Sequence, residues 1–331
     1  MISQLATSGP IPLDAILWLI LIAGFPFISG LVLLFWLFRR AGRWARPIPI
    51  NWTSWVERKW LLRISIAVLA VYATALVYGY FIETQWVEVT KTELRVQHPV
   101  LGHDRFRIVQ LSDLHLDKVG RLERHVVDLV RETKPDLILI TGDYGNSKDT
   151  PASMVEVLRR LEAPYGKYTV LGNNDVSSYR PQSIAAGGGI LLRNQVKLFE
   201  EKGQCLRLAG QDSMHPLPLR EILGTEKNEA YTIFLQHKPD AVDELALLKP
   251  GQHVDLFLCG HTHGGQICIP FWGAVVTESK YHKKYERGLY DVGGVTMIVN
   301  RGIGMVGLPI RFLARPEVGV IDLVYRPTSS P

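Results

Sequence analysis

The feature that most constrains the fold of this 331-residue chain is a series of five short apolar runs, each of which ends in polar residues. The runs span residues 106–111, 137–141, 168–171, 231–235 and 254–259. Short apolar runs bounded by polar turns are typical of buried strands. Helical patterns separate several runs, and parallel strands need such crossovers, so the alternation predicts an α/β or α+β domain whose strand ends meet at one edge of a sheet.

Three helices are predicted between the runs. Apolar residues recur at helical spacing over 122–130 and indicate a helix that stops before Pro135. Thr150 and Pro151 are typical of the N-cap and first position of a second helix. A third helix is predicted over 240–248.

The polar residues after the runs are of metal-ligand type. They comprise seven side chains: Asp113, His115, Asp143, Asn173, His237, His261 and His263. Oxygen and imidazole ligands without a thiolate suit Mn, Fe, Zn or Mg. Seven ligands exceed the need of one ion. We therefore predict two divalent metal ions bridged by a carboxylate, a pair that would activate a water and neutralise the oxyanion of an in-line displacement.

The most specific cluster is Gly-His-Thr-His-Gly-Gly at 260–265. Two imidazoles between glycines, directly after an apolar run, have little structural use, and glycine lets the backbone turn both rings inward. An isolated Asp-x-His or Gly-Asp at a strand end is more often a turn or a cap than a ligand. The ordered occurrence of all five clusters nevertheless predicts one shared site.

These motifs resemble those of the calcineurin-like metallophosphoesterases. The resemblance covers residues 105–324 and rests on D-x-H, G-D, G-N-x-D, a lone His and G-H-x-H in that order. It extends to the membrane-associated bacterial phosphodiesterase-like branch through residues 260–266, 284–290, 300–304 and 309–311. It implies a four-layer αββα sandwich that contains a binuclear phosphoesterase site.

The resemblance also assigns roles to the candidate ligands. It implies that one ion is held by Asp113, His115, Asp143 and His263, and the second by Asp143, Asn173, His237 and His261, with Asp143 bridging. Asp143 and His263, together with Asn174, would be the catalytic residues.

Position 174 departs from the family pattern. Family members usually carry a His there, used as a general acid or to stabilise charge on the phosphoryl group, whereas this chain has Asn174. An amide donates a hydrogen bond but delivers no proton. A leaving group that is itself a phosphate needs little protonation, so we predict a pyrophosphate or another ester with a good leaving group. The family branch that fits this argument is the UDP-2,3-diacylglucosamine pyrophosphatases. Their substrate is amphiphilic, and an anchored enzyme would bind it at the membrane surface.

Three further residues are candidate substrate contacts: His282, Lys284 and Arg301, whose positive charges could meet a phosphate. Two other functions stay open. A nucleotide or nucleic-acid phosphodiesterase would use the same metals, but nucleic acid is disfavoured because the chain beyond residue 82 is formally neutral. A non-catalytic membrane scaffold would keep the fold without the chemistry.

Two long apolar stretches precede the domain. Residues 15–38 carry no charge, and residues 61–82 carry only Arg63, so each is long enough to cross a bilayer. We predict a membrane anchor over 1–82, a linker or first strand over 83–104 and the phosphoesterase domain over 105–331. The phospholipid membrane and an amphiphilic phosphoester or pyrophosphate are the predicted partners.

The net charge of +5 lies within the first 82 residues, where seven basic residues oppose Asp14 and Glu57. Most of them are in the loop between the two apolar stretches, which would therefore face the cytoplasm. The charge bias predicts a multi-pass protein of the bacterial inner membrane with an extracytoplasmic domain, and a cytoplasmic domain is the alternative. Three cysteines are too few for a disulfide framework, and Cys259 is predicted to be a buried thiol.

Overall fold

The computed structural model describes the backbone of residues 13–40, 55–146, 151–177, 179–224, 230–245, 247–248 and 252–326, and the side chains of these residues except 13–22, 35, 38–40 and 55–58. The chain divides into two compact units, a helical unit at Gly9–Ile82 and a larger unit at Glu83–Pro331. The predicted N-cap Thr150 lies outside the described residues.

The helical unit consists of α1 (Leu13–Arg40) and α2 (Trp55–Val77), followed by a π-helical turn at Tyr78–Ile82. Of the described residues, one helical stretch, Lys59–Gln85, is long and apolar enough to cross a membrane, with a mean hydropathy of 2.0. The apolar part of α1 whose side chains are described, Ala23–Leu34, is shorter than a bilayer requires. The prediction of two membrane spans is therefore not confirmed for the first stretch.

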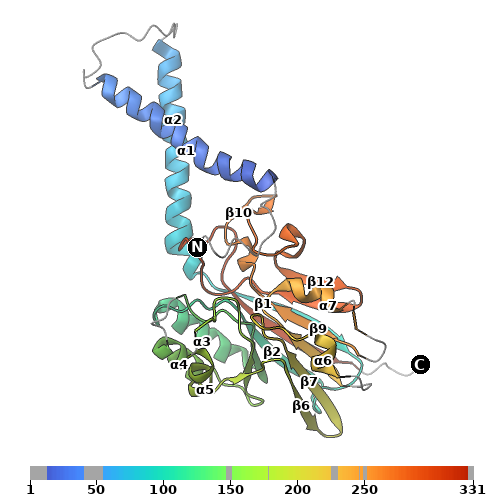
Figure 1. The fold of residues 1–331 in the computed structure, drawn as a ribbon. Helices are drawn as coiled ribbons and strands as arrows, with labels where there is room; N and C mark the ends of the chain where they lie inside the picture. The colour runs from blue at the N-terminus through green and yellow to red at the C-terminus, as the bar shows by residue number, and fades with distance from the viewer. Residues whose placement is uncertain are drawn as a thin grey trace. The chain divides into compact units, whose positions relative to one another are not determined.

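The larger unit contains two six-stranded sheets (Figure 1). The first has the order β1 (Glu88–Val96), β14 (Glu317–Tyr325), β2 (Arg105–Leu111), β3 (Leu137–Ile140), β4 (Lys167–Thr169) and β5 (Ile190–Leu191). The second has the order β12 (Gly288–Val292), β13 (Val295–Val299), β9 (Leu256–Cys259), β8 (Tyr231–Leu235), β7 (Gln204–Gly210) and β6 (Gln195–Glu201). A short hairpin, β10 (Cys268–Ile269) and β11 (Gly273–Ala274), stands apart from both sheets.

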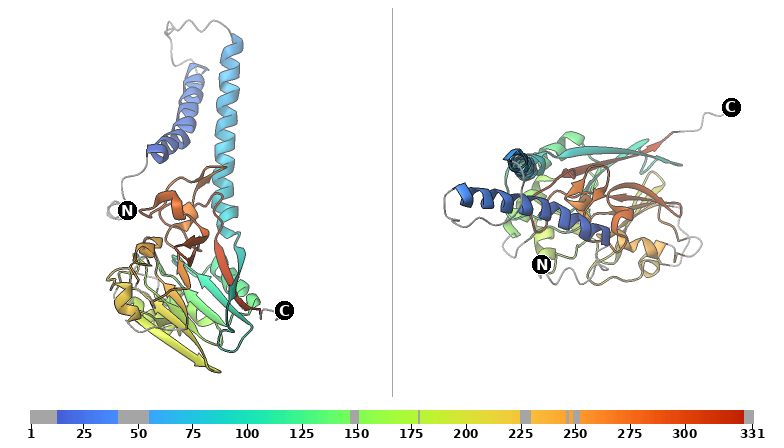
Figure 2. Two further views of the ribbon diagram at one scale, coloured as in Figure 1. Left: turned by 90° about the vertical axis from the view of Figure 1, so that its right-hand side faces the viewer. Right: turned by 90° about the horizontal axis from the view of Figure 1, so that it is seen from above.

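Three apolar cores separate four layers. One lies between the first sheet and the helices α3 (Arg121–Thr133), α4 (Pro151–Arg160) and α5 (Arg180–Ala186). A second fills the space between the sheets, where Ile108 and Leu139 share a core with Leu208 and Leu258. The third packs α6 (Leu219–Leu223) and α7 (Val242–Leu245) against the second sheet. The fold is a mixed α/β sandwich, with helices on both outer faces (Figures 1 and 2).

The five predicted strands all form, with ends that shift by up to two residues, and α3 and α4 begin where the sequence indicates. Two expectations need correction. The helix predicted over 240–248 is shorter: a 3₁₀ turn at Pro239–Ala241 is followed by α7, and the amides of Leu247 and Leu248 then donate to the carbonyls of Glu244 and Leu245, three residues earlier rather than four. The strand ends also do not share one sheet: β2, β3 and β4 lie in the first sheet, whereas β8 and β9 lie in the second.

The segment predicted as a linker or first strand contains β1, which pairs with β14 in parallel along its whole length. All three cysteines are free thiols, and Cys259 is buried as predicted. Burial at this position follows from β9, a central strand whose four residues are all buried.

Candidate metal centre

The candidate ligands lie where the strand ends of the two sheets meet. Asp113 and His115 follow β2, and Asp143 follows β3. His237 follows β8, and His261 follows β9 together with His263, which opens the 3₁₀ turn at His263–Gly265. All six of these side chains are buried, although each comes from a loop.

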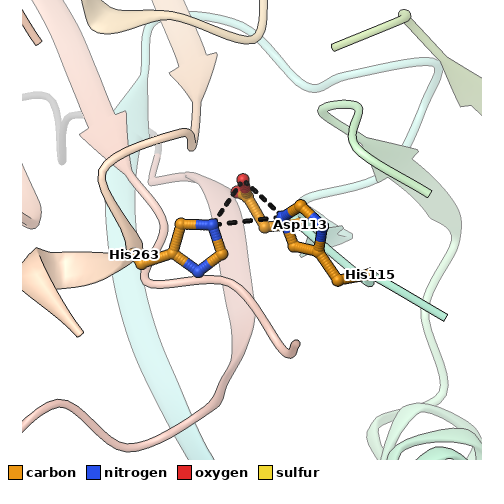
Figure 3. Close-up of side chains that lie close together, drawn as sticks. All are labelled: Asp113, His115 and His263. Atoms are coloured by element: carbon orange, nitrogen blue, oxygen red, sulfur yellow. Dashed lines mark hydrogen bonds and ion pairs between the residues drawn. The ribbon is translucent and has the colours of Figure 1, made fainter. Parts of the chain in front are cut away.

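Figure 3 shows three of the side chains pointing at one another across this junction. The His115 Nε2 and His263 Nε2 atoms are 3.2 Å apart. The Asp113 Oδ1 atom lies 3.3 Å from His263 Nε2 and 3.9 Å from His115 Nε2. These three ligand atoms are close enough to share one ion.

A second group adjoins the first. His237 Nε2 lies 3.3 Å from Asp143 Oδ2 and 3.9 Å from Asp113 Oδ1. Asp143 Oδ2 is also 3.7 Å from His115 Nε2, and His261 Nδ1 lies 3.1 Å from His237 Nε2. Asp113 therefore belongs to both groups, and Asp143 Oδ2 lies within 3.7 Å of one imidazole of each.

The donor atoms fit a divalent cation. Asp113 Oδ1 and Asn173 Oδ1 are buried and accept no hydrogen bond, although buried polar atoms in folded proteins almost always have a partner. Carboxylate oxygens, amide oxygens and imidazole nitrogens are ligand types that divalent metals accept. These residues could therefore hold the metals that the sequence predicts.

The backbone at the ligands is strained. Five of them are non-glycine residues in left-handed conformation: Asp113 (φ 49°), His115 (φ 43°), Asp143 (φ 56°), His261 (φ 70°) and His263 (φ 52°). Such residues cost about 1–3 kcal/mol each and cluster at functional sites. The strain turns each side chain inward directly after its strand.

Two glycines are required by close approach. A Cβ atom on Gly260 would lie 1.9 Å from Ser112 Oγ and 2.3 Å from Asp113 Oδ2. A Cβ atom on Gly172 would lie 2.0 Å from Asp143 Oδ1. Each glycine therefore leaves the space that one of the two shared carboxylates occupies.

Comparison with known proteins agrees with this geometry. Residues 106–265 match the family model of calcineurin-like phosphoesterases. A protein of Bacillus subtilis (strain 168), "Uncharacterized metallophosphoesterase YkuE", is 37% identical over 261 residues, which are 74% of this chain and 89% of that protein. The chain is a calcineurin-like phosphoesterase.

Two further relatives of the phosphoesterase carry informative names. "Phosphodiesterase YaeI" of Escherichia coli (strain K12) is 28% identical over 274 residues, 78% of this chain and 97% of that protein. "Transmembrane protein with metallophosphoesterase domain" of Danio rerio is 29% identical over 281 residues, 79% of this chain and 63% of that protein.

Burial keeps two imidazoles of the phosphoesterase site neutral, whereas the carboxylates keep a third protonated. Burial and the neighbouring His263 lower the pKa of His115 to about 4, and burial and His237 lower the pKa of His261 to about 3. For His237, burial disfavours the charged ring, but Asp143 and Asp113 outweigh it and raise its pKa to about 9. His237 therefore offsets part of the charge of the two carboxylates when no cation is bound.

Hydrogen bonds that the sequence analysis did not identify orient the ligands. Asp113 Oδ2 accepts from Ser112 Oγ at 2.5 Å and from the His261 amide at 3.0 Å, which turns Oδ1 toward the site. His237 Nδ1 lies 2.7 Å from the Thr141 carbonyl oxygen and donates to it, and Nε2 faces Asp143. The contacts of Asp113 with His261 and of His237 with Thr141 join segments that are far apart in the chain, so no local pattern could indicate them.

Asp175 also supports the site, although the sequence analysis assigned it no role. Its carboxylate accepts from the amides of Asp143 (2.8 Å), Tyr144 (2.9 Å) and Gly172 (2.9 Å), and it pairs with buried Arg180 at 3.5 Å. Burial, with Asp143 nearby, raises the pKa of Asp175 to about 6. Asp175 therefore positions the strained loop of Asp143. Its place at the end of the G-N-x-D motif is the signal that could have identified it.

Arg311 is another buried side chain that positions a loop near the site. It is fully buried and donates to backbone carbonyls, including those of Gly304 (2.6 Å), Ala314 (2.7 Å) and Arg301 (3.0 Å). A buried guanidinium can satisfy several carbonyls at once because its five donors are fixed in one plane. It holds the loop at 301–314. The only indication of this role in the sequence is that Arg311 lies in the 309–311 segment of the family resemblance.

Asn174 lies beside the shared carboxylate Asp143. Its backbone amide donates to Asp143 Oδ1 at 2.8 Å, and its Nδ2 donates to Asp143 Oδ2 at 2.6 Å. Asn174 and His115 also line a cleft of about 640 Å³. The cleft has polar walls at Asp117, Lys118, Glu123 and Asn146 and apolar walls at Leu114, Leu122, Met305, Val306, Leu308 and Pro309.

The three predicted substrate contacts remain predictions. Arg301 is held by two carboxylates, Glu317 at 3.0 Å and Glu88 at 2.9 Å, which already neutralise its charge. His282 and Lys284 lie in the 3₁₀ turn at His282–Tyr285, where Lys284 is exposed. Glu278 lies in the same loop region. Its backbone carbonyl oxygen is 3.1 Å from His261 Nε2, and burial raises the pKa of its carboxyl group.

Proposed function

We propose that this phosphoesterase is a membrane-anchored, two-metal hydrolase that cleaves a phosphodiester or pyrophosphate bond in an amphiphilic substrate. The family, the phosphodiesterase named among its relatives and the two adjoining groups of candidate ligands support this proposal. When bound, a pair of divalent metals polarises the phosphoryl group and lowers the pKa of a coordinated water. The chain contributes Asp143 and Asp113 as shared ligands and a fixed Asn174 amide.

Asn174 is the observation that carries the choice of substrate. Its Nδ2 is oriented by Asp143, so the amide is fixed at the edge of the ligand cluster and lines the cleft. An amide can stabilise a phosphoryl oxygen by donating a hydrogen bond, but it cannot protonate a departing alkoxide. A departing phosphate is stable without a proton. We therefore propose a pyrophosphate, or an ester with an equally good leaving group.

The cleft and the helical unit support an amphiphilic substrate. Polar side chains line the cleft beside His115, whereas Met305, Val306 and Leu308 provide an apolar wall that could contact an acyl chain. The apolar stretch Lys59–Gln85 supports an anchor in the bacterial inner membrane. A lipid-linked pyrophosphate at the outer face agrees with the charge bias of the N-terminal segment. UDP-2,3-diacylglucosamine is the corresponding candidate at the cytoplasmic face.

The Asn174→His variant tests the leaving-group argument. Wild-type and variant proteins are compared on a lipid-linked pyrophosphate and on an alkyl phosphodiester, both in detergent with Mn²⁺. We expect the wild type to prefer the pyrophosphate. The new imidazole should raise kcat for the alkyl ester by about 10²-fold, because a positioned general acid contributes about 10²–10⁴-fold, and should change pyrophosphate turnover little.

The matched control is Asn146→His, which places an imidazole in the same cleft without the contact to Asp143. This control should raise turnover of neither substrate. If the wild type already hydrolyses the alkyl ester as fast as the pyrophosphate, the argument from the leaving group is wrong.

A further inference from the structure

Phe271 is an unusually exposed aromatic residue. It lies at the turn of the β10–β11 hairpin, its relative exposure is 112%, and its backbone is left-handed at φ 64°. A bulky side chain in this conformation is uncommon, and full exposure to water gives no compensating burial. The turn is closed by a hydrogen bond from the Trp272 amide to the Ile269 carbonyl, at 3.1 Å. The fold therefore presents this ring outward.

A second loop presents apolar side chains beside the hairpin. Leu308 and Leu313 are 59% and 44% exposed. The hairpin and this loop are joined by hydrogen bonds from the Cys268 amide to the Phe312 carbonyl (2.8 Å) and from Gln266 Nε2 to the Leu308 carbonyl (2.9 Å). Arg311 also holds this loop by hydrogen bonds to the carbonyls of Gly304 and Ala314. Phe271, Leu308 and Leu313 therefore belong to one rigid surface.

Basic and indole side chains surround these apolar residues. Lys283 Nζ lies 3.4 Å from the centre of the Trp272 ring. Arg287 Nη1 donates to the Leu313 carbonyl at 2.7 Å. Arg315 Cζ lies 3.5 Å from the centre of the Trp86 ring, which is itself 49% exposed. Tryptophan and cationic side chains around a small apolar patch are typical of surfaces that sit at a lipid headgroup layer.

This surface, which we call the apolar rim, comprises Phe271, Leu308 and Leu313. It is continuous with the candidate metal centre, because Leu308 lines the same cleft as His115 and Asn174.

We propose that the apolar rim inserts into the headgroup and acyl boundary of a phospholipid bilayer. The basic residues Lys283, Lys284, Arg287 and Arg315 favour an anionic lipid surface over a protein partner. In this arrangement an acyl-chain substrate passes from the bilayer along Leu308 into the cleft without crossing water. That last step rests on the proposed function, whereas insertion of the rim does not.

The test measures the depth of a nitroxide attached at position 271. The full chain carries Cys205→Ser and Phe271→Cys and is reconstituted in vesicles of phosphatidylethanolamine and phosphatidylglycerol. The two remaining cysteines are buried. Collision of the label with oxygen and with a water-soluble nickel chelate is then measured. The matched control is Leu198→Cys, an exposed apolar position on β6, and Leu308→Cys provides a second rim position.

We expect labels at 271 and 308 to collide with oxygen more often, and with the nickel chelate at least fivefold less often, than the label at 198. If the rim labels meet the chelate as often as the control, the rim faces water and the proposal is overturned. Shielding from both reagents would show a protein cover, from a second copy or from this chain, and would overturn it equally. The readout requires no turnover, so failure of the proposed function leaves it interpretable.

Discussion

Gly260→Ala tests whether the position of the Asp113 carboxylate decides activity. The alanine methyl would lie 1.9 Å from Ser112 Oγ and 2.3 Å from Asp113 Oδ2. Non-bonded heavy atoms are stable at about 3.5 Å, so one of these groups must move by more than about 1 Å. Both are fixed by the 2.5 Å hydrogen bond between them, and the displacement therefore reaches the ligand atom Oδ1.

The magnitude follows from two effects. Overpacking a well-filled interior costs about 1–3 kcal/mol, which lowers Tm by roughly 5 °C in a domain of this size. Displacement of a catalytic group by about 1 Å costs on the order of 10²-fold in rate. We therefore expect kcat/KM for an aryl phosphodiester to fall about 100-fold, with weaker metal binding, in a protein that still unfolds cooperatively.

The control is Gly203→Ala in the β6–β7 turn. Gly203 has φ +74° and open space around its Cα, so alanine there costs about 1–2 kcal/mol through backbone strain alone. This control should lose stability comparable to that lost by Gly260→Ala and keep its activity within about twofold. Equal activity in the two variants would contradict this prediction, because it would show that the position of Asp113 does not limit turnover.

Three further predictions concern the groups that support the ligands. Ser112→Ala removes the donor to Asp113 and should weaken metal binding about 10–100-fold, as measured by competition with a fluorescent chelator; unchanged affinity would contradict the role of this hydroxyl. Asp175→Asn leaves Arg180 buried without its carboxylate and should lower the free energy of unfolding by about 3–5 kcal/mol in a urea titration, and a loss below 1 kcal/mol would exclude a structural ion pair. Removal of metal with EDTA should lower Tm, because Asp113 and Asp143 then lie close together without a cation, and excess Mn²⁺ should restore it.

The strands could be predicted because their signals are local. An apolar run such as 137–141 followed by Gly-Asp specifies both a buried strand and the point at which it ends. The division of the strands between two sheets is not determined by local sequence. β4 and β8 both lead to the site, but their separation into different sheets depends on pairing between segments far apart in the chain, β14 with β2 and β13 with β9.

The clustering of six candidate ligands could be predicted for the same reason, since each follows one of the predicted strands. The residues that hold these ligands in place could not be predicted. The partners of Arg301 illustrate the difference: its sequence context suggests a phosphate contact, but it pairs with Glu317 and with Glu88, which lies 213 residues away. A charged side chain whose partner is so distant in sequence cannot be distinguished from a free one until the chain is folded.

The metal content of the purified full chain shows whether the site binds two ions. Protein loaded with Mn²⁺ and freed of excess metal should contain about two ions per chain by elemental analysis. Asp143→Asn, which alters a ligand that faces both groups, should contain fewer than one. A wild-type content near zero, or a content that does not change in the Asp143→Asn variant, would contradict the account of a binuclear phosphoesterase site.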